Sequence, residues 1–345
     1  MDAPISAARR LLAVGGRIAI VVVALGATAL ILNSTVDELD WGAVADALRS
    51  LSDAELLALG SGWLVWLACQ GLQTAALVPD LPVRRGILAF LGPGAVASVV
   101  PGPSDLPIRY RMLTGWGRSA REAGLAVAAG GIFSVGIKLV LPVVAAVGLV
   151  VSGVPLDGAW RTLVTIAAII GVGVAVVAVA LGSERVTMGL GRLLDPAWRF
   201  ALRLLRRDAE GELADRLVAA RAEAIGLVRE RWLIATWGTV LAAAARVGLL
   251  IMCLRFTGVG EDAIGWTGIF VVYAFVQGLT AVPIVPGNAG VTELAYISMV
   301  TSVTGAATIN EVTAAVLLFR LLTWILVIVG GLVALAIWRL GRSAS

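Results

Sequence analysis

The chain has 345 residues, of which 59% are hydrophobic, and a formal net charge of +4. Several apolar runs approach the roughly 20 residues that a membrane-spanning helix needs. The composition therefore indicates a polytopic helical membrane protein and leaves no room for a large soluble domain. Histidine is absent, which excludes imidazole proton relays, histidine metal sites and serine–histidine–acid triads.

The first part of the chain predicts three spans and one short helix. Residues 14–32 follow a cluster of arginines and lack a convincing cleavage site, so we expect a retained span rather than a signal peptide. The acidic stretch 33–55 carries apolar residues at helical spacing, which predicts a short helix lying in the membrane interface. Further spans are expected at 56–78 and 123–151.

Between these last two spans, residues 86–100 form an apolar run that is too short and too interrupted for a full crossing. The run ends in Pro-Gly-Pro at 101–103. Asp105 follows, and a series of arginines begins at Arg109. We expect a hairpin here.

The second part of the chain begins with a predicted span at 160–181. Residues 183–231 are polar and rich in arginine with interleaved acids, which is typical of an amphipathic helix pair in solvent or at the interface. A basic segment of this kind can contact anionic lipid. A span at 232–254, an apolar run at 266–282 and a last long helix at 312–338 complete the chain.

An irregular segment interrupts the second part at residues 281–293. It contains two prolines that cannot donate backbone hydrogen bonds and two glycines that lower the helical tendency: Pro283, Pro286, Gly287 and Gly290. Lipid offers no partners for freed backbone groups, so such a segment must face protein or a water-filled cavity. A new helix is expected at 291–303, and its N-terminus presents N–H groups and a positive dipole end, as in transporter substrate sites. The other interpretation is a kinked structural helix with Glu293 as an ordinary capping acid.

The distribution of arginines determines the predicted topology. If 86–100 crossed fully, the arginines that follow it and those of 183–231 would lie outside, against the positive-inside rule. A re-entrant hairpin keeps both segments cytoplasmic, and a second hairpin at 266–308 returns the C-terminus to the same side. We therefore expect an all-α polytopic protein of about six spanning helices plus two re-entrant hairpins, with both termini cytoplasmic.

The order of helix, broken hairpin and helix occurs twice, at 56–151 and at 232–340. Each hairpin has a Pro-Gly turn followed by an acid. Inverted repeats whose broken helices meet near the midplane are a transporter architecture. We expect residues 1–345 to form one transmembrane domain with two repeat-like halves.

Three basic residues lie well inside apolar runs: Lys138, Arg246 and Arg320. Burying each costs at least ~2.5–3.5 kcal/mol on insertion scales, so each needs a partner or a wet cavity. Glu293 and Asp105 are the expected partners. One interpretation is a set of structural ion pairs that lock the hairpins. The other is a polar cavity that receives a lipid phosphate, in which Glu293 holds Arg320 until the phosphate replaces it.

Neutral polar residues could line the same cavity. Gln70, Gln73 and Gln277 lie in predicted membrane segments, and hydrogen bonding between helices is the alternative role for them. No glycine-rich nucleotide loop, metal-ligand cluster or nucleophile motif is present, so we expect no enzyme activity, no cofactor and no metal. A membrane transferase that uses Asp105 or Glu293 as a base remains an alternative.

Two segments of the second part carry a resemblance. Residues 286–293 read Pro-Gly-Asn-Ala-Gly-Val-Thr-Glu, and residues 318–324 read Leu-Phe-Arg-Leu-Leu-Thr-Trp. They resemble the lysylphosphatidylglycerol synthase transmembrane-region family, flippase-like membrane proteins of which some are fused to a soluble aminoacyl transferase. Asn288 stands where the family has glycine. Residues 101–111 resemble the family's first-half motif less closely, because Ser104 also stands where glycine is common.

The resemblance, which covers roughly residues 10–340, implies a stand-alone lipid flippase of the bacterial inner membrane without the transferase domain. Its substrate would be an anionic lipid, either an aminoacylated phospholipid or a polyprenyl-phosphate-linked sugar. The alternative is a non-transporting membrane subunit that assists a lipid or cell-envelope glycan enzyme. Lipid-modifying enzymes or a second copy of the chain are candidate partners, and nucleic acid is not expected. The expected substrate-binding residues are Arg320, Arg246, Lys138, Glu293, Asp105, Arg109, Gly287, Asn288 and Gly290.

Overall fold

Every secondary-structure element that a computed structural model of the protein describes is a helix, in agreement with the all-α prediction. The structure describes residues 40–100, 103–151, 158–185, 188–189, 191–193, 195–196, 213–281 and 286–343. Several features that the sequence predicts lie outside these residues: the span at 14–32, the turn at 101–102, Pro283, most of 183–212, and both chain ends.

Four helices within the described residues are long and apolar enough to cross a membrane. They are α3 (Asp53–Ala76), α6 (Ala120–Val151), the Trp232–Phe256 part of α9 (Leu213–Phe256) and the stretch Ala306–Gly341. The shortest has 24 residues, which gives about 36 Å at 1.5 Å per residue, more than the ~30 Å hydrocarbon core. A further apolar helix, α7, spans Gly158–Gly182. The total of six spans stays a prediction.

The last long helix is interrupted in a way the sequence does not predict. It consists of α12 (Ile309–Arg320), a π-helical segment η3 (Leu321–Ile325) and α13 (Leu326–Ser343). Single π-helical turns inside α-helices are rare and occur often at functional sites. This one begins directly after Arg320.

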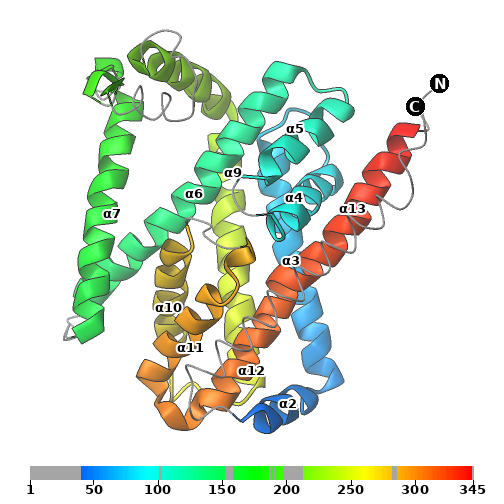
Figure 1. Cartoon of the computed structure of the whole chain (residues 1–345), viewed down its shortest axis with the longest axis vertical. Helices are drawn as coiled ribbons and strands as arrows, with labels where there is room; N and C mark the ends of the chain where they lie inside the picture. Colours follow the sequence, from blue (N-terminus) through cyan, green and yellow to red (C-terminus); the bar gives the residue numbers. More distant parts are fainter. Residues whose placement is uncertain are drawn as a thin grey trace.

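Four shorter helices occupy the regions where the sequence predicts hairpins. They are α4 (Val83–Ala97), α5 (Asp105–Gly115), α10 (Trp266–Leu279) and α11 (Val291–Thr304). The longest has 15 residues, which gives about 22 Å, so none of them alone reaches across a ~30 Å core. In Figure 1, α4 and α5 lie in the upper half and α10 and α11 in the lower half. Re-entrance and the inverted relation of the halves remain predictions.

Close backbone packing holds α4 between α3 and α13. A Cβ atom at Gly86 of α4 would overlap the carbonyl oxygen of Gly71 in α3, so only glycine permits this approach. On the other side, α13 packs along α4. The C-terminal residues of α4, including Gly94 and Ser98, consequently face the interior, where they line a cavity.

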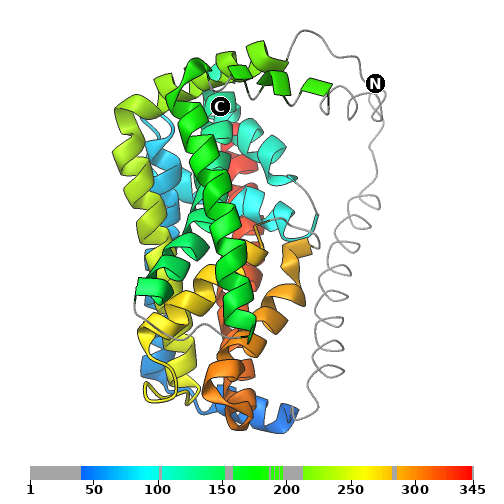
Figure 2. The ribbon, with the colours of Figure 1, turned by 90° about the vertical axis from the view of Figure 1, so that its left-hand side faces the viewer.

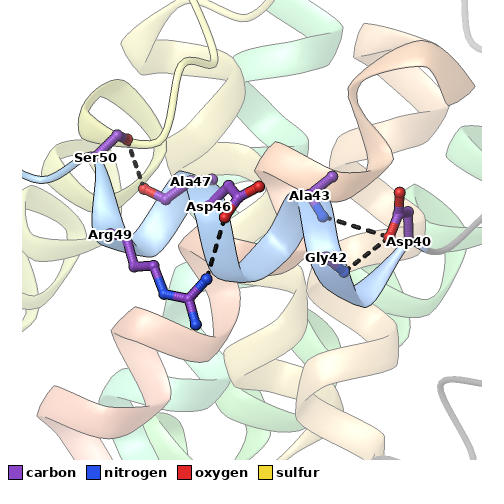
Figure 3. Close-up of polar contacts among 7 residues, drawn as sticks. All are labelled: Asp40, Gly42, Ala43, Asp46, Ala47, Arg49 and Ser50. Atoms are coloured by element: carbon purple, nitrogen blue, oxygen red, sulfur yellow. Dashed lines mark hydrogen bonds and ion pairs between the residues drawn. The ribbon is translucent and has the colours of Figure 1, made fainter.

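The short helix α2 (Trp41–Arg49) confirms the helix predicted within 33–55. Asp40 caps it, and its Oδ1 accepts hydrogen bonds from the N–H groups of Gly42 at 2.7 Å and Ala43 at 3.4 Å (Figure 3). The N–H of Asp40 donates to Oδ1 of Asn310 at 2.9 Å, which ties α2 to the start of α12. Its location in the membrane interface stays a prediction.

The two ends of the bundle collect different elements. In Figures 1 and 2, α2, the turn between α9 and α10, and the start of α12 lie at one end. The helix α5 and the end of α13 lie at the other end. This grouping matches the predicted topology, and the assignment of either end to the cytoplasm remains a prediction.

Fully buried side chains gather where α9, α10, α11 and α12 meet. Leu250, Val276, Tyr296 and Phe319 are fully buried there, and the rings of Tyr296 and Phe319 pack edge to face at 5.7 Å. By contrast, large apolar side chains are exposed along the outer faces of the long helices, as expected for surfaces that contact lipid.

Candidate functional site

A polar cavity of about 270 Å³ lies where α3, α4, α6, α9, α10 and the η3–α13 segment meet. The chain contains one lysine, Lys138, and it lines this cavity together with Arg246. The chain also contains three glutamines, and all of them line it: Gln70, Gln73 and Gln277. In a sequence that is 59% hydrophobic, this concentration of polar side chains marks the cavity as the main polar site of the membrane region.

The helix α6 lacks one backbone hydrogen bond next to Lys138. Pro142 follows one turn later and has no N–H, so the carbonyl of Lys138 lacks its usual helical donor. At the same level α10 approaches α6 closely, because a Cβ atom at Gly278 would lie 2.5 Å from Cγ of Pro142. This packing places Tyr273 and Gln277 of α10 beside Lys138 in the cavity wall.

Arg246 of α9 is held by aromatic rings rather than by an acid. Its guanidinium carbon lies 5.8 Å from the ring centroid of Trp66 and 5.7 Å from that of Phe319, within the range of cation–π attraction. Its Nε is buried and has no hydrogen-bond partner in the described part of the chain. The positive charges of Arg246 and Lys138 repel each other. Among the described lining residues there is no carboxylate, so the cavity is suited to an anion.

The neutral polar residues of the wall are partly oriented by their own hydrogen bonds. Nε2 of Gln73 donates to Oγ1 of Thr239 at 2.8 Å, and Nε2 of Gln277 donates to the hydroxyl of Tyr296 at 3.4 Å. The amide oxygens of these glutamines still offer acceptors for a ligand. The cavity can therefore bind hydroxyl groups as well as negative charge.

Arg320 and Glu293 form a buried ion pair next to the cavity. Nε of Arg320 lies 2.7 Å from Oε1 of Glu293, and the two residues are 6% and 2% exposed. Nη2 of Arg320 donates to the carbonyl of Gly287 at 2.8 Å. The expected pairing of these two residues is confirmed. Arg320 itself does not line the cavity, although Thr323 in the π-helical segment does.

The turn before α11 depends on residues that tolerate a positive φ. Gly287 has φ +59°, and a Cβ atom there would overlap the indole nitrogen of Trp324. Asn288 has φ +51°, and its Nδ2 donates to the carbonyl of Thr280 at 3.1 Å. Asparagine enters this region more readily than other non-glycine residues, which explains how the turn accommodates it. Gly290, with φ +80°, directly precedes α11, which begins at Val291 within the predicted range.

Asp105 and Arg109 lie one turn apart in α5, with Oδ2 and Nη2 separated by 3.6 Å. The expectation that Asp105 is the ion-pair partner of Lys138 or Arg246 is therefore wrong, because the α5 geometry gives it Arg109 instead. Its charge acts on Lys138 only at longer range.

Arg109 lines a second polar cavity of about 50 Å³, bounded by α3, α4, α5 and α6. This smaller cavity shares four wall residues with the larger one: Gln70, Gln73, Phe90 and Ser134. Arg109 is thus adjacent to the main cavity.

The structure divides the predicted site residues into three groups. Lys138 and Arg246 line the main cavity. Arg109, paired with Asp105, lines the smaller cavity beside it. Arg320, Glu293 and Gly287, here called the Arg320 cluster, lie next to the main cavity without lining it. Sequence reasoning missed Tyr273, although its spacing of four residues from Gln277 places both on one helix face. In the described residues no group of three or more cysteine or acidic side chains is placed to hold a metal ion.

Comparison with known families matches residues 17–331 to the family described as lysylphosphatidylglycerol synthase TM region. The matched range includes every residue of the main cavity and the whole Arg320 cluster. No curated protein matches the chain.

Proposed function

Because the chain belongs to the lysylphosphatidylglycerol synthase TM-region family, we propose that it binds the headgroup of an anionic lipid in the main cavity and moves that lipid across the membrane. One observation carries the proposal. Lys138 and Arg246 face one cavity whose described lining contains no carboxylate. The partial burial of the two cations is costly and their charges repel, and a phosphate bound between them relieves both effects.

The size and lining of the cavity define which part of a lipid fits. Its volume of about 270 Å³ is close to the lower end of ordinary small-molecule sites, ~300 Å³, so it suits a headgroup and not a pair of lipid tails. Amide and hydroxyl groups in the wall can bind glycerol or sugar hydroxyls. The charge balance favours a phosphate headgroup without an amine over an aminoacylated one.

The geometry also refines the role of Arg320. In the sequence-based hypothesis, Arg320 pairs with Glu293 in the empty protein and binds the lipid phosphate instead when lipid enters. In the structure Arg320 bonds both Glu293 and the carbonyl of Gly287, so withdrawing it would leave a buried carboxylate and a partly buried carbonyl without their partner. We assign phosphate binding to Lys138 and Arg246, and we assign Arg320 the positioning of the second hairpin against α12.

Liposomes containing the purified protein and a fluorescent phosphatidylglycerol test this function. Wild-type protein should make the inner-leaflet lipid accessible to an external quencher, and a Lys138→Met/Arg246→Met variant should not. Methionine keeps apolar packing while removing both charges. Lipid binding without translocation would contradict transport and support a non-transporting subunit, and covalent modification of the lipid would support a transferase.

We further propose the predicted topology, with both termini cytoplasmic and the two hairpins entering from opposite faces as an inverted repeat. Single cysteines introduced at Arg111, which is exposed in the same helix as Arg109, and at Arg207 and Glu261, in a Cys69→Ser/Cys253→Ser background, provide the test. An impermeant reagent should label position 261 from outside the cell and should label 111 and 207 only after lysis. External labelling at 207 would overturn the topology and the inverted repeat together.

A further inference from the structure

A separate apolar cavity of about 600 Å³ lies between α6, α7, α10 and α11. Its walls include Val144, Trp160, Phe270 and Val303, and Thr267 contributes the only hydroxyl among its lining residues. Its apolar lining differs from that of the main cavity, which carries two cations and three glutamines.

The two cavities follow one another along the same pair of helices. On α6, Lys138 and Leu141 line the polar cavity, and Val144, Ala145 and Gly148 line the apolar one; their spacing of three or four residues places them on one face. Leu141 and Val144 are separated by about 4.5 Å along the axis.

The helix α10 shows the same succession. Gln277 and Tyr273 line the polar cavity, and Phe270 and Thr267 line the apolar one, again at a spacing of three or four residues. The polar and the apolar cavity therefore succeed one another along the faces of both α6 and α10.

We infer that the apolar cavity holds one hydrocarbon chain of the lipid whose headgroup occupies the polar cavity. The inference rests on the proposed function, because it requires an amphiphile in the groove. A hydrocarbon chain attached to a headgroup beside Lys138 would run past Leu141, which lines the polar cavity, to Val144 and Phe270, which line the apolar one. The bound chain then points toward the bundle end that carries α2 and the α9–α10 turn (Figure 1).

The protein offers a matched pair of glycine substitutions in α6 for testing the apolar cavity. Gly148 lines the apolar cavity, and a Cβ atom at this position would meet nothing within 4 Å, so Gly148→Leu places a side chain in the cavity without a backbone clash. Gly136 lies on the same helix, is equally open to a Cβ atom, and lines none of the three cavities described above. Gly136→Leu is therefore the control.

The probe is phosphatidylglycerol with a photoactivatable group on one chain, bound to purified protein in nanodiscs. In the wild type we expect cross-links at Val144, Phe270 or Val271, identified by mass spectrometry. Gly148→Leu should reduce them at least fivefold, and Gly136→Leu should leave them unchanged. Lys138→Met/Arg246→Met should also reduce these cross-links, because the lipid's hydrocarbon chain reaches the apolar cavity only when its headgroup is bound in the polar one.

Cross-links that persist in Lys138→Met/Arg246→Met would show that bulk lipid fills the cavity and would overturn the inference. Cross-links between two protein copies at these residues, obtained with a photoactivatable amino acid in place of Val144, would overturn it in favour of an interface. Failure of lipid translocation by the wild type in liposomes would overturn the proposed function by a separate measurement.

Discussion

Arg320 and Glu293 form one group of charges, which is buried, and Lys138 and Arg246 form another, which is half-buried around the main cavity. In the first group opposite charges lie 2.7 Å apart, and the guanidinium also donates to the backbone carbonyl of Gly287. In the second group two like charges share a cavity whose described lining has no acid. An ion pair that lines no cavity holds two helices in one arrangement. Two like charges around a cavity raise the free energy of the empty protein, and a bound anion lowers it. The difference separates a positioning contact from a binding site.

The largest effect is expected where the ion pair is broken on one side. Arg320→Ala leaves the carboxylate of Glu293 buried and unpaired, and removal of one partner of such a pair typically costs about 3–5 kcal/mol. We expect a marked fall in Tm measured in detergent, together with loss of transport. Arg320→Lys keeps the charge but loses the fork that bonds two acceptors, so it should retain part of both.

The double variant Arg320→Met/Glu293→Leu distinguishes the two roles of Arg320. Replacing both members of a buried pair by apolar residues often restores stability. If the pair only positions the hairpin, the double variant should regain most of its Tm and measurable transport. A stable double variant with no lipid binding would instead support the hypothesis that Arg320 exchanges Glu293 for lipid phosphate.

The second group should respond in the opposite way. A hydrogen bond to a charged group contributes about 1.5–3 kcal/mol, so Lys138→Met or Arg246→Met should weaken binding of phosphatidylglycerol by roughly 10- to 150-fold. The Tm of the empty protein should stay the same or rise, because one of two repelling charges is removed. Fluorescence quenching of Trp66, which lies in the same wall, would report binding, with the other tryptophans replaced by phenylalanine. A large fall in Tm with unchanged binding would assign these cations to structure.

The turn that Arg320 clamps gives an intermediate effect. Gly287→Ala forces alanine to φ +59° and against Trp324, and backbone strain of this kind costs on the order of 1–3 kcal/mol. Gly117→Ala is the control, since Gly117 has φ +83° but a Cβ atom there meets nothing within 4 Å. The Tm of Gly287→Ala should fall further than that of Gly117→Ala, because only the former also forces a Cβ atom against Trp324. Equal destabilisation would show that the overlap with Trp324 adds nothing to the backbone strain at Gly287.

The sequence predicts the first group better than the second, for a physical reason. Glu293 lies in the first turn of a helix that a proline–glycine break must start, and Arg320 is a buried charge that needs an acid, so their pairing can be inferred. Depth along a helix is readable from sequence, but rotation about the helix axis is set by packing. For this reason the sequence could not show that Lys138 and Arg246 line one cavity while Arg320 does not.

The misassigned partner of Asp105 has a similar origin. A spacing of four residues allows Asp105 and Arg109 to pair whenever α5 is helical, and this local pairing competes with any distant cation. The π-helical segment after Arg320 and the apolar cavity leave no pattern in the sequence, because both arise from the fit between helices.

The smallest effect tests the charge of the cavity directly. Gln70 lines both polar cavities, and Gln70→Glu adds one carboxylate with little change in shape. The new charge should weaken binding of phosphatidylglycerol by about three- to tenfold, equivalent to roughly 0.7–1.4 kcal/mol, and should improve binding of lysylphosphatidylglycerol, whose amines it attracts. Gln70→Met, which removes the amide without adding charge, should weaken both lipids alike. Competition between the two lipids for the purified variants measures this ratio. If Gln70→Glu leaves the ratio at the wild-type value, then the balance of charge in this cavity does not select the headgroup, and the contrast between the two groups of charges has no functional meaning.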